Sequence, residues 1–224
     1  VALTASLSEH GKGRVVVAMM CVPCGTQILS ALGAVAWNDV RPGAGVYTRH
    51  WGPAYMKDEA CNDAEDSAYF QAANRGKKSI CIDIRSAEGQ QVVHRLVQKA
   101  DVVVENYKFG DLARYGLDYD SLAASNPAIV YCSITGFGQT GPYATRPGYD
   151  FLIQGMGGIM SLTGEAEGEP QKVGVPIADI MSGMFAAVAV KGAPRHAAIP
   201  GRPICRPQDR IDGLVDICIS MISM

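Results

Sequence analysis

The chain has 224 residues, a formal net charge of −2 at pH 7, and a composition that is 48% hydrophobic and 19% charged. This balance excludes a disordered chain and a polycation, so nucleic acid is not expected as a partner. The longest apolar stretches are Val15–Val22, which is too short to cross a bilayer, and Val175–Val190, which Asp179 interrupts. The sequence therefore predicts one or two globular domains with no membrane partner.

Seven cysteines are spread along the chain. An odd number in a chain of this size favours free thiols in a reducing compartment, so we expect the cytoplasm, or the mitochondrial matrix in a eukaryote. Cys21 and Cys24 form a lone CVPC motif. No second CxxC and no histidine at ligand spacing accompany it, so no metal is expected.

The amino-terminal part contains one predicted helix and two turn-rich segments. Thr26–Ala36 places its apolar residues on one stripe, which is typical of a short buried helix. Val40–Pro53 is rich in glycine and proline. It is either a solvated connection or an anion-binding rim in which Arg41 and Arg49 meet phosphate or carboxylate. Lys57–Ser67 is acidic and polar, which predicts a surface excursion.

A strand, helix, strand unit follows. Ser79–Arg85 alternates like a strand, Ala87–Ala100 has an apolar helical face, and Asp101–Glu105 (DVVVE) is a continuous apolar strand. A strand that is apolar on both faces is typical of a parallel sheet covered by helices on both sides. The fold class predicted from this unit is α/β.

Two predicted strands end in polar, glycine-containing loops. The loop Asn106–Gly110 follows the strand Asp101–Glu105, and a second loop begins at Thr135, after the predicted strand Ala128–Ile134. Between them, Leu112–Leu117 and Tyr119–Ala124 read as short helical turns. Open α/β sheets bind their ligands at the carboxyl ends of the strands. The two loops therefore predict a common site.

Asp150 stands between two glycine-rich stretches. The segment Gly136–Pro147 (GFGQTGPYATRP) cannot be regular, whereas Phe151–Met160 resembles a glycine-interrupted helix with Asp150 in its first turn. Asp150 either caps this helix or reacts, because a carboxylate kept ionised at a helix start can attack an acyl carbon.

A long polar loop, Gly164–Pro176, leads to another predicted helix. We expect its core-facing stripe to consist of large apolar residues, namely Val175, Ile180, Met181, Met184, Phe185 and Val188.

Five segments carry a family resemblance: ANRGKKSICIDIRSAEGQQ, DVVVENYKFGDLARYGLDYDSL, NPAIVYCSITGFGQTGPYATRPGYDF, GGIMSLTG and KVGVPIADIMSG. Together they resemble the family III CoA-transferases, also called the CaiB/BaiF family, from about Thr26 to Val190. The resemblance implies the large domain of that fold, a Rossmann-like parallel sheet with helices on both faces, here incomplete.

The resemblance also implies a reaction and a site. In this family the aspartate of the GYD motif, here Asp150, attacks an acyl-CoA thioester and later carries CoA as an aspartyl thioester. The acceptor is a free carboxylic acid, and coenzyme A enters as the acyl-CoA substrate. Arg41 and Arg114 would meet CoA phosphates. The full set of implied CoA contacts is Arg41, Ile82, Asp83, Ile84, Arg85, Asn106, Tyr107, Arg114, Thr135, Gly136, Phe137 and Gly138.

Two segments depart from the family pattern. Before Arg41, VPCGTQILSALGAVAWNDV keeps the family spacing but lacks its Lys, Glu and Asp positions. After a partial large domain over residues 1–190, residues 191–210 are basic and proline-rich, and no helix is expected there. They are interpreted as a frame change in the coding sequence or as a genuine linker. Residues 211–224 resume a family-like pattern. Members of the family are nearly twice as long and form interlocked homodimers.

Two alternative functions remain beside CoA transfer between a thioester and an acid. One is the racemase branch of the same fold, which moves a proton α to the thioester; Tyr149 argues against it, because racemases commonly carry His before the aspartate. The other is an inactive CoA-binding fragment, since the family pocket is completed by segments beyond position 224.

Overall fold

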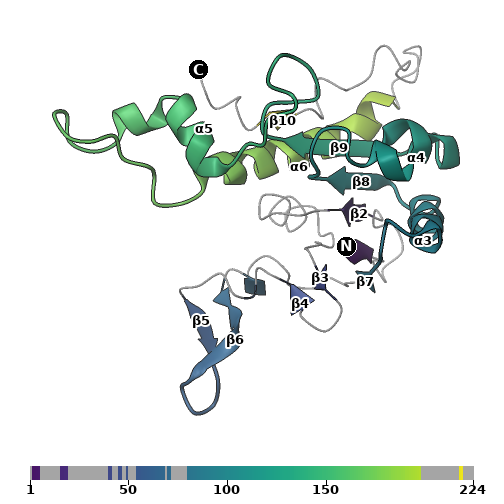
Figure 1. Cartoon of the computed structure of the whole chain (residues 1–224), viewed down its shortest axis with the longest axis horizontal. Helices are drawn as coiled ribbons and strands as arrows, with labels where there is room; N and C mark the ends of the chain where they lie inside the picture. The colour runs from purple at the N-terminus through teal and green to yellow at the C-terminus, as the bar shows by residue number, and fades with distance from the viewer. Residues whose placement is uncertain are drawn as a thin grey trace.

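The computed structural model describes residues 2–5, 16–19, 40–41, 45–46, 49, 54–68, 70–71, 80–197 and 217–218 (Figure 1). Six strands of these ranges form one sheet in the order β10-β9-β8-β2-β1-β7. Their bounds are β1 Ala2–Ala5, β2 Val16–Met19, β7 Ile80–Cys81, β8 Val102–Glu105, β9 Val130–Thr135 and β10 Ile217–Cys218. The predicted helix Thr26–Ala36 lies outside the described residues.

The sheet is mixed rather than wholly parallel. Strands β2, β8, β9 and β10 pair in parallel, whereas β1 runs antiparallel to both of its neighbours, β2 and β7. The predicted α/β class is confirmed. The antiparallel β1 was not predicted, because the sequence before Val16 has no clear period.

The strand predicted over Ser79–Arg85 is shorter in the structure. Only Ile80 and Cys81 pair with β1, and the chain then turns into the helix that follows. The turn is set by Ser86, whose hydroxyl accepts from the Gly89 amide at 3.0 Å and caps the helix. The alternating sequence pattern extends to Arg85, whereas the pairing of this strand with β1 ends at Cys81.

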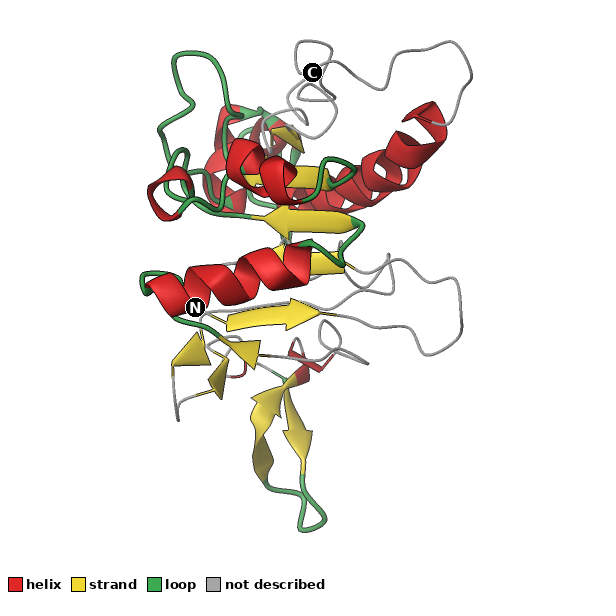
Figure 2. Ribbon diagram, turned by 90° about the vertical axis from the view of Figure 1, so that its right-hand side faces the viewer, coloured by secondary structure: helices red, strands yellow, loops and turns green. Residues whose placement is uncertain are grey.

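The helices on one side of the sheet match their predictions. Helix α3 spans Ala87–Val97, the 3-10 turn η2 spans Ala113–Tyr115, and α4 spans Tyr119–Ser125. Figure 2 shows α3 and α4 in front of the strands. Val93 and Val97 of α3 are fully buried, as the apolar stripe of that helix predicted.

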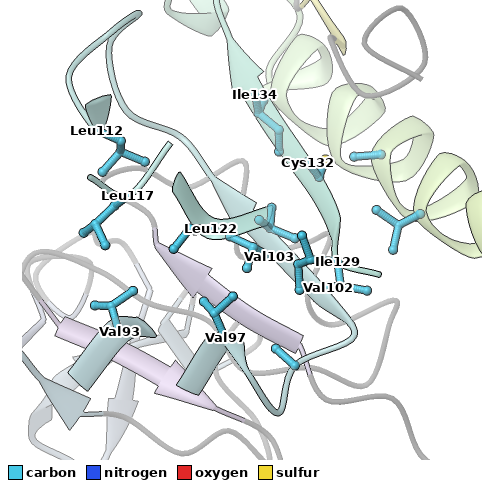
Figure 3. Close-up of a cluster of buried hydrophobic side chains, with 14 of the residues drawn as sticks. Val93, Val97, Val102, Val103, Leu112, Leu117, Leu122, Ile129, Cys132 and Ile134 are labelled. Carbon is cyan, nitrogen blue, oxygen red and sulfur yellow. The ribbon is translucent and has the colours of Figure 1, made fainter. Parts of the chain in front are cut away.

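The core lies around β8 and β9. All four residues of β8 are buried, so both of its faces are covered. Helix α6, Ile177–Ala197, lies on the opposite side of β9 from α4 (Figures 1 and 3). Leu117, Leu122 and Ile134 are among the largest fully buried side chains. This is the two-sided packing that the continuous apolar strand predicted.

The predicted buried stripe of α6 is wrong. Met184, Phe185 and Val188 are exposed, as is Val175 just before the helix. Mostly small residues face the core instead, and the buried set is Ala178, Ser182, Gly183, Ala186, Ala187 and Val190. The stretch Ile180–Val190 of α6 carries no charged residue on any side, so periodicity alone could not select the inner face. Small side chains let the helix axis approach β9 closely.

The expectation of no helix after Val190 is also wrong for its first part. Helix α6 continues to Ala197 and includes Pro194. A proline inside a helix removes one backbone hydrogen bond, but the flanking Lys191, Ala193 and Arg195 are good helix formers. Residues 198–216, which hold the other prolines of this segment, lie outside the described residues.

Two hairpins lie apart from the main sheet. Strands β3 (Val40–Arg41) and β4 (Gly45–Val46) form one, and β5 (Tyr55–Lys57) and β6 (Asp63–Ser67) form the other. The β5–β6 hairpin projects away from the sheet in Figures 1 and 2, as the predicted surface excursion required. No helix of the described residues is long and apolar enough to span a membrane.

Candidate active site

Asp150 is the first residue of helix α5, Asp150–Met156, as the sequence predicted. Its carboxylate does not cap that helix. Oδ1 accepts the backbone amides of Ala178 at 2.8 Å and Asp179 at 3.3 Å, both in the first turn of α6. These amides have no partner within their own helix, so a carboxylate is well suited to satisfy them. Asp150 therefore opens one helix and caps another.

Gln154 holds the other oxygen of the same carboxylate. It lies one turn further along α5, is fully buried, and donates from Nε2 to Asp150 Oδ2 at 2.6 Å. Its Oε1 accepts the Val173 amide at 2.8 Å, and its second N–H points to the Val175 carbonyl at 3.4 Å. Because a backbone amide can only donate, the Val173 contact fixes which end of the Gln154 side chain faces Asp150.

Asp179 adds a second carboxyl group beside Asp150. Its burial, and secondly the charge of Asp150, raise the pKa of Asp179 from a usual value of 3.8 to about 7. Desolvation disfavours the charged form, and a neighbouring like charge disfavours it further. Close to neutral pH, therefore, a large fraction of Asp179 carries its proton.

Two glycines hold Asp150 close to the end of β9. A methyl group built on Gly136 would come within 2.3 Å of the Gly148 Cα, and the reverse substitution gives the same distance. The backbones of Gly136 and Gly148 are thus in contact and close the loop between them, residues 137–147, at its base. This contact is called the neck. The family resemblance implied CoA contacts at Gly136 and Gly138. In the structure, the close approach at Gly136 is to Gly148, two residues before the carboxylate.

The loop that the neck closes, residues 137–147, is packed by its own side chains. The Phe137 and Tyr143 rings meet edge to face at 5.6 Å, and the Arg146 guanidinium lies 4.4 Å from the Tyr143 ring centroid. Phe137 also packs on Ile153 and Ala178, which belong to the two helices that flank Asp150. The loop, α5 and α6 therefore form one packed unit around the carboxylate.

Several predicted CoA contacts meet at the carboxyl edge of β8 and β9. Asn106 follows β8, and its Nδ2 donates to the Ile134 carbonyl of β9 at 2.5 Å. The Tyr107 amide donates to Glu105 Oε2 at 2.8 Å. Thr135 ends β9, and its hydroxyl accepts the Gly138 amide at 3.0 Å. The Asn106 hydrogen bond thus joins the ends of β8 and β9, which are neighbouring parallel strands.

The other predicted contacts lie further from Asp150. Strand β7 is three strand spacings from β8, roughly 14 Å, with its carboxyl end on the same edge of the sheet. Ile82 and Ile84 after it are buried, whereas Asp83 and Arg85 are exposed and pair with each other at 2.9 Å. Arg114 is exposed and pairs with Asp111 at 2.9 Å. The Arg41 backbone lies in β3, and its side chain is outside the part that the structure describes.

The two helix-start amides and Gln154 were missed by sequence reasoning. Gln154 had a usable signal, because a glutamine four residues after an aspartate faces it on a helix. The amides of Ala178 and Asp179 had none, since they contact Asp150 across nearly thirty positions. Among the described residues, no group of His, Cys, Asp or Glu is arranged to hold a metal ion. Cys21 and Cys24 lie outside them.

Comparison with known sequences identifies the family. A sequence model described as CoA-transferase family III matches residues 14–202. The chain belongs to CoA-transferase family III. The motifs GFGQTGP and PGYD, which build the neck and place Asp150, fall within the matched range.

Similar family III proteins carry specific names. A succinate–glutarate CoA-transferase of Agrobacterium fabrum is 49% identical over 179 residues, which are 80% of this chain and 44% of that protein. A succinyl-CoA:glutarate CoA-transferase of Mus musculus is 43% identical over 168 residues, 75% of this chain and 37% of that protein. The chain spans less than half the length of these curated relatives.

A solved family III structure has the same fold. The crystal structure of a CaiB/BaiF family protein from Brucella suis superposes with a TM-score of 0.69 at 50% sequence identity, and the match covers 81% of this chain and 48% of that one. The predicted fold, the large domain of this family, is therefore confirmed for the matched part.

Proposed function

We propose that this protein transfers CoA from an acyl-CoA thioester to a free carboxylic acid, with Asp150 as the nucleophile and an aspartyl-CoA thioester as the covalent intermediate. The observation that carries the proposal is the Asp150 carboxylate itself. It is only partly buried, it is oriented by three donors, and it stands next to the end of β9. A fixed carboxylate with an accessible lone pair is suited to attack an acyl carbon.

The names of the relatives suggest the substrate class. Both curated relatives described above are named for glutarate together with succinate or succinyl-CoA. We therefore propose a short acyl-CoA donor and a dicarboxylic acid acceptor for this protein, and succinyl-CoA with glutarate is the first pair to test.

CoA would bind along the carboxyl edge of the sheet. Asn106, Tyr107 and Thr135–Gly138 would approach the part of CoA next to the thioester, since they lie at the strand ends nearest Asp150. Ile82–Arg85, Arg114 and Arg41 would meet the more distant part. Arg85 and Arg114 are largely exposed, and exposed ion pairs contribute little, so both can exchange a carboxylate for a phosphate.

Mass spectrometry of the purified protein after incubation with succinyl-CoA tests the nucleophile. A covalent adduct on the peptide that contains Asp150 is expected, and it should be absent in Asp150→Ala. An adduct that persists in Asp150→Ala would contradict the assignment. Incubation in deuterated water covers the racemase alternative, because label at the α-carbon of the acyl group would indicate proton transfer instead.

Calorimetric titration with CoA tests the phosphate contacts. Arg114→Ala and Arg85→Ala should each weaken CoA binding severalfold, because each removes one charge-assisted contact. Arg95→Ala is the matched control, since Arg95 is exposed on α3 away from the proposed site. Equal affinity in all four proteins would contradict this part of the proposal.

A second copy of the chain is the proposed protein partner. The exposed apolar side chains of Met184, Phe185 and Val188 on α6 form a surface that favours burial. The resemblance described above implies an interlocked homodimer, and this surface is where contact would be expected. Light scattering of the purified protein tests it, and Val188→Glu should shift the mass toward the monomer. A monomeric wild-type protein would contradict the proposal.

A further inference from the structure

The two oxygens of Asp150 have different environments. A carboxylate offers about four in-plane acceptor sites, two on each oxygen. Both sites on Oδ1 are taken by the amides of Ala178 and Asp179. On Oδ2, Gln154 takes one site at 2.6 Å. The remaining in-plane lone pair is therefore on Oδ2.

We propose that Gln154 is a positioning residue that presents Oδ2 as the attacking atom, while the first turn of α6 keeps Oδ1 as the carbonyl oxygen of the aspartyl intermediates. This inference rests on the proposed function. It assigns to named atoms the parts of the reaction that take place on Asp150 itself, rather than on the acyl group of the substrate.

In the first step, a lone pair of Oδ2 forms a bond to the thioester carbon. The C–S bond breaks, and its electron pair leaves on sulfur as the CoA thiolate. The product is an anhydride in which Oδ2 is the bridging atom. Asp150 has then lost its charge, and Oδ1 is the carbonyl oxygen.

The next two steps take place at the Asp150 carboxyl carbon. The thiolate adds there, an electron pair moves onto Oδ1, and its return breaks the bond to Oδ2, so the donor acid leaves as a carboxylate. When the acceptor carboxylate adds to the resulting thioester, an electron pair again moves onto Oδ1, and the C–S bond breaks. Both additions therefore develop negative charge on Oδ1.

Backbone amides at the start of α6 are placed to stabilise that charge. Donors about 3 Å from a developing oxyanion are the usual arrangement in acyl transfer, and the amides lie at 2.8 and 3.3 Å. In the last step the thiolate attacks the acyl carbon of the acceptor. The bond from that carbon to the bridging oxygen breaks, and its electron pair restores the Asp150 carboxylate.

The burial of Gln154 supports a positioning role. An amide side chain with no exposed surface is costly to bury unless its polar atoms are paired. Here every one of them has a partner: Asp150 Oδ2, the Val175 carbonyl and the Val173 amide. The side chain thus connects the carboxylate to the loop that leads into α6, so both oxygens are held by one structural unit.

Two substitutions at Gln154 test the proposal through the rate of Asp150 acylation by succinyl-CoA. Gln154→Leu keeps the approximate size but removes the donor, so we expect acylation on the order of a hundredfold slower with little change in KM. Protonated Glu in Gln154→Glu can donate to Oδ2 and accept from Val173, whereas ionised Glu repels Asp150. Its acylation rate relative to the wild type should therefore rise as the pH falls.

Gln91→Leu makes the same chemical change at an exposed position of α3 and should acylate at the wild-type rate. If Gln154→Leu does not fold, the pH dependence of Gln154→Glu still decides the question. Wild-type acylation rates in both Gln154 variants at every pH would overturn the inference and leave the proposed function intact. Absence of any adduct in the wild-type protein would instead overturn the proposed function.

An infrared measurement tests the role of Oδ1. With ¹³C-labelled aspartate, the carbonyl band of the trapped aspartyl thioester should lie at lower wavenumber in the folded protein than after denaturation, because two amides bind the oxygen. An unchanged band in an intact adduct would overturn the assignment of Oδ1.

Discussion

Gly136 and Gly148 touch through their backbones, so that a methyl group on either would lie 2.3 Å from the Cα of the other. Real Cβ atoms do not approach backbone that closely, and neither partner is a flexible side chain that could move away. The end of β9 and the residues just before Asp150 can therefore be in contact only because neither Gly136 nor Gly148 has a side chain.

Substitution of either glycine should displace the carboxylate. Gly136→Ala must widen the neck, and overpacking of this kind costs about 1–3 kcal/mol of unfolding free energy. We expect a lower midpoint in urea and a strong loss of Asp150 acylation. Gly192→Ala in α6 is the control, since no atom lies within 4 Å of its added methyl group and alanine favours a helix. A Gly136→Ala protein as stable as the wild type would contradict the close backbone contact between Gly136 and Gly148.

The pH dependence of stability should depend on Asp179. Its folded pKa, about 7, lies above the usual value of 3.8, so folding favours the protonated form. The stabilising contribution of this group is fully present below pH 3.8 and is lost as the pH rises to about 7. The slope for one group approaches about 1.4 kcal/mol per pH unit. In Asp179→Asn, the free energy of unfolding measured in urea should not show this fall between pH 3.8 and about 7. The same pH dependence in the variant and the wild type would contradict the role of Asp179.

Neutralising Asp150 should lower the pKa of Asp179. The Asp150 charge is the second cause of the raised value, after burial, so in Asp150→Asn we expect the pKa to fall below about 7 yet stay above 3.8. Carbon NMR titration of the Asp179 carboxyl group measures this. Glu88→Gln, an exposed change on α3, should leave it unaltered. A pKa that rises or does not move in Asp150→Asn would show that the two carboxyl groups are not coupled.

Asn126 should be a strong determinant of stability outside the site. Its Nδ2 donates to the Val97 and Ala100 carbonyls at 2.9 and 2.8 Å, which joins the end of α3 to the end of α4. Asn126→Asp removes both donors and places charge against carbonyl oxygens, so a loss of about 2–4 kcal/mol is expected, larger than for Asn126→Ala. Urea unfolding measures both, and the gap should narrow at low pH as the aspartate is protonated. Equal stability of the two variants would contradict the assigned contacts.

Much of the sheet and its helices could be predicted from local patterns. Val102–Glu105 is apolar throughout and is buried on both faces, and the stripe through Val93 and Val97 selected the correct side of α3. Such patterns depend on residues close together in sequence, for which the period alone decides the face. The position of Asp150 at the start of α5 was predicted for the same reason, because the irregular loop with its prolines ends before it and an apolar segment follows.

The contacts that define the site could not be predicted in this way. The amides of Ala178 and Asp179 reach Asp150 from a helix that begins after a long polar loop, and nothing local indicates that they meet. Gly136 was recognised as part of an irregular loop, but the pattern does not indicate that its backbone meets Gly148. On α6 the large apolar residues were predicted to form the buried face, but the smaller Ala186 and Ala187 are buried instead.

Because Asp150 caps α6, the chemistry at its carboxylate should affect the stability of that helix. A covalent bond at Asp150 removes the negative charge from the helix start, where a charge contributes about 0.3–1 kcal/mol. Hydrogen exchange of the first amides of α6 would then be slow in the free protein and faster in the adduct. Each catalytic cycle would loosen and restore a helix that packs directly on β9, and amide exchange there would report the state of the nucleophile without any probe at the substrate.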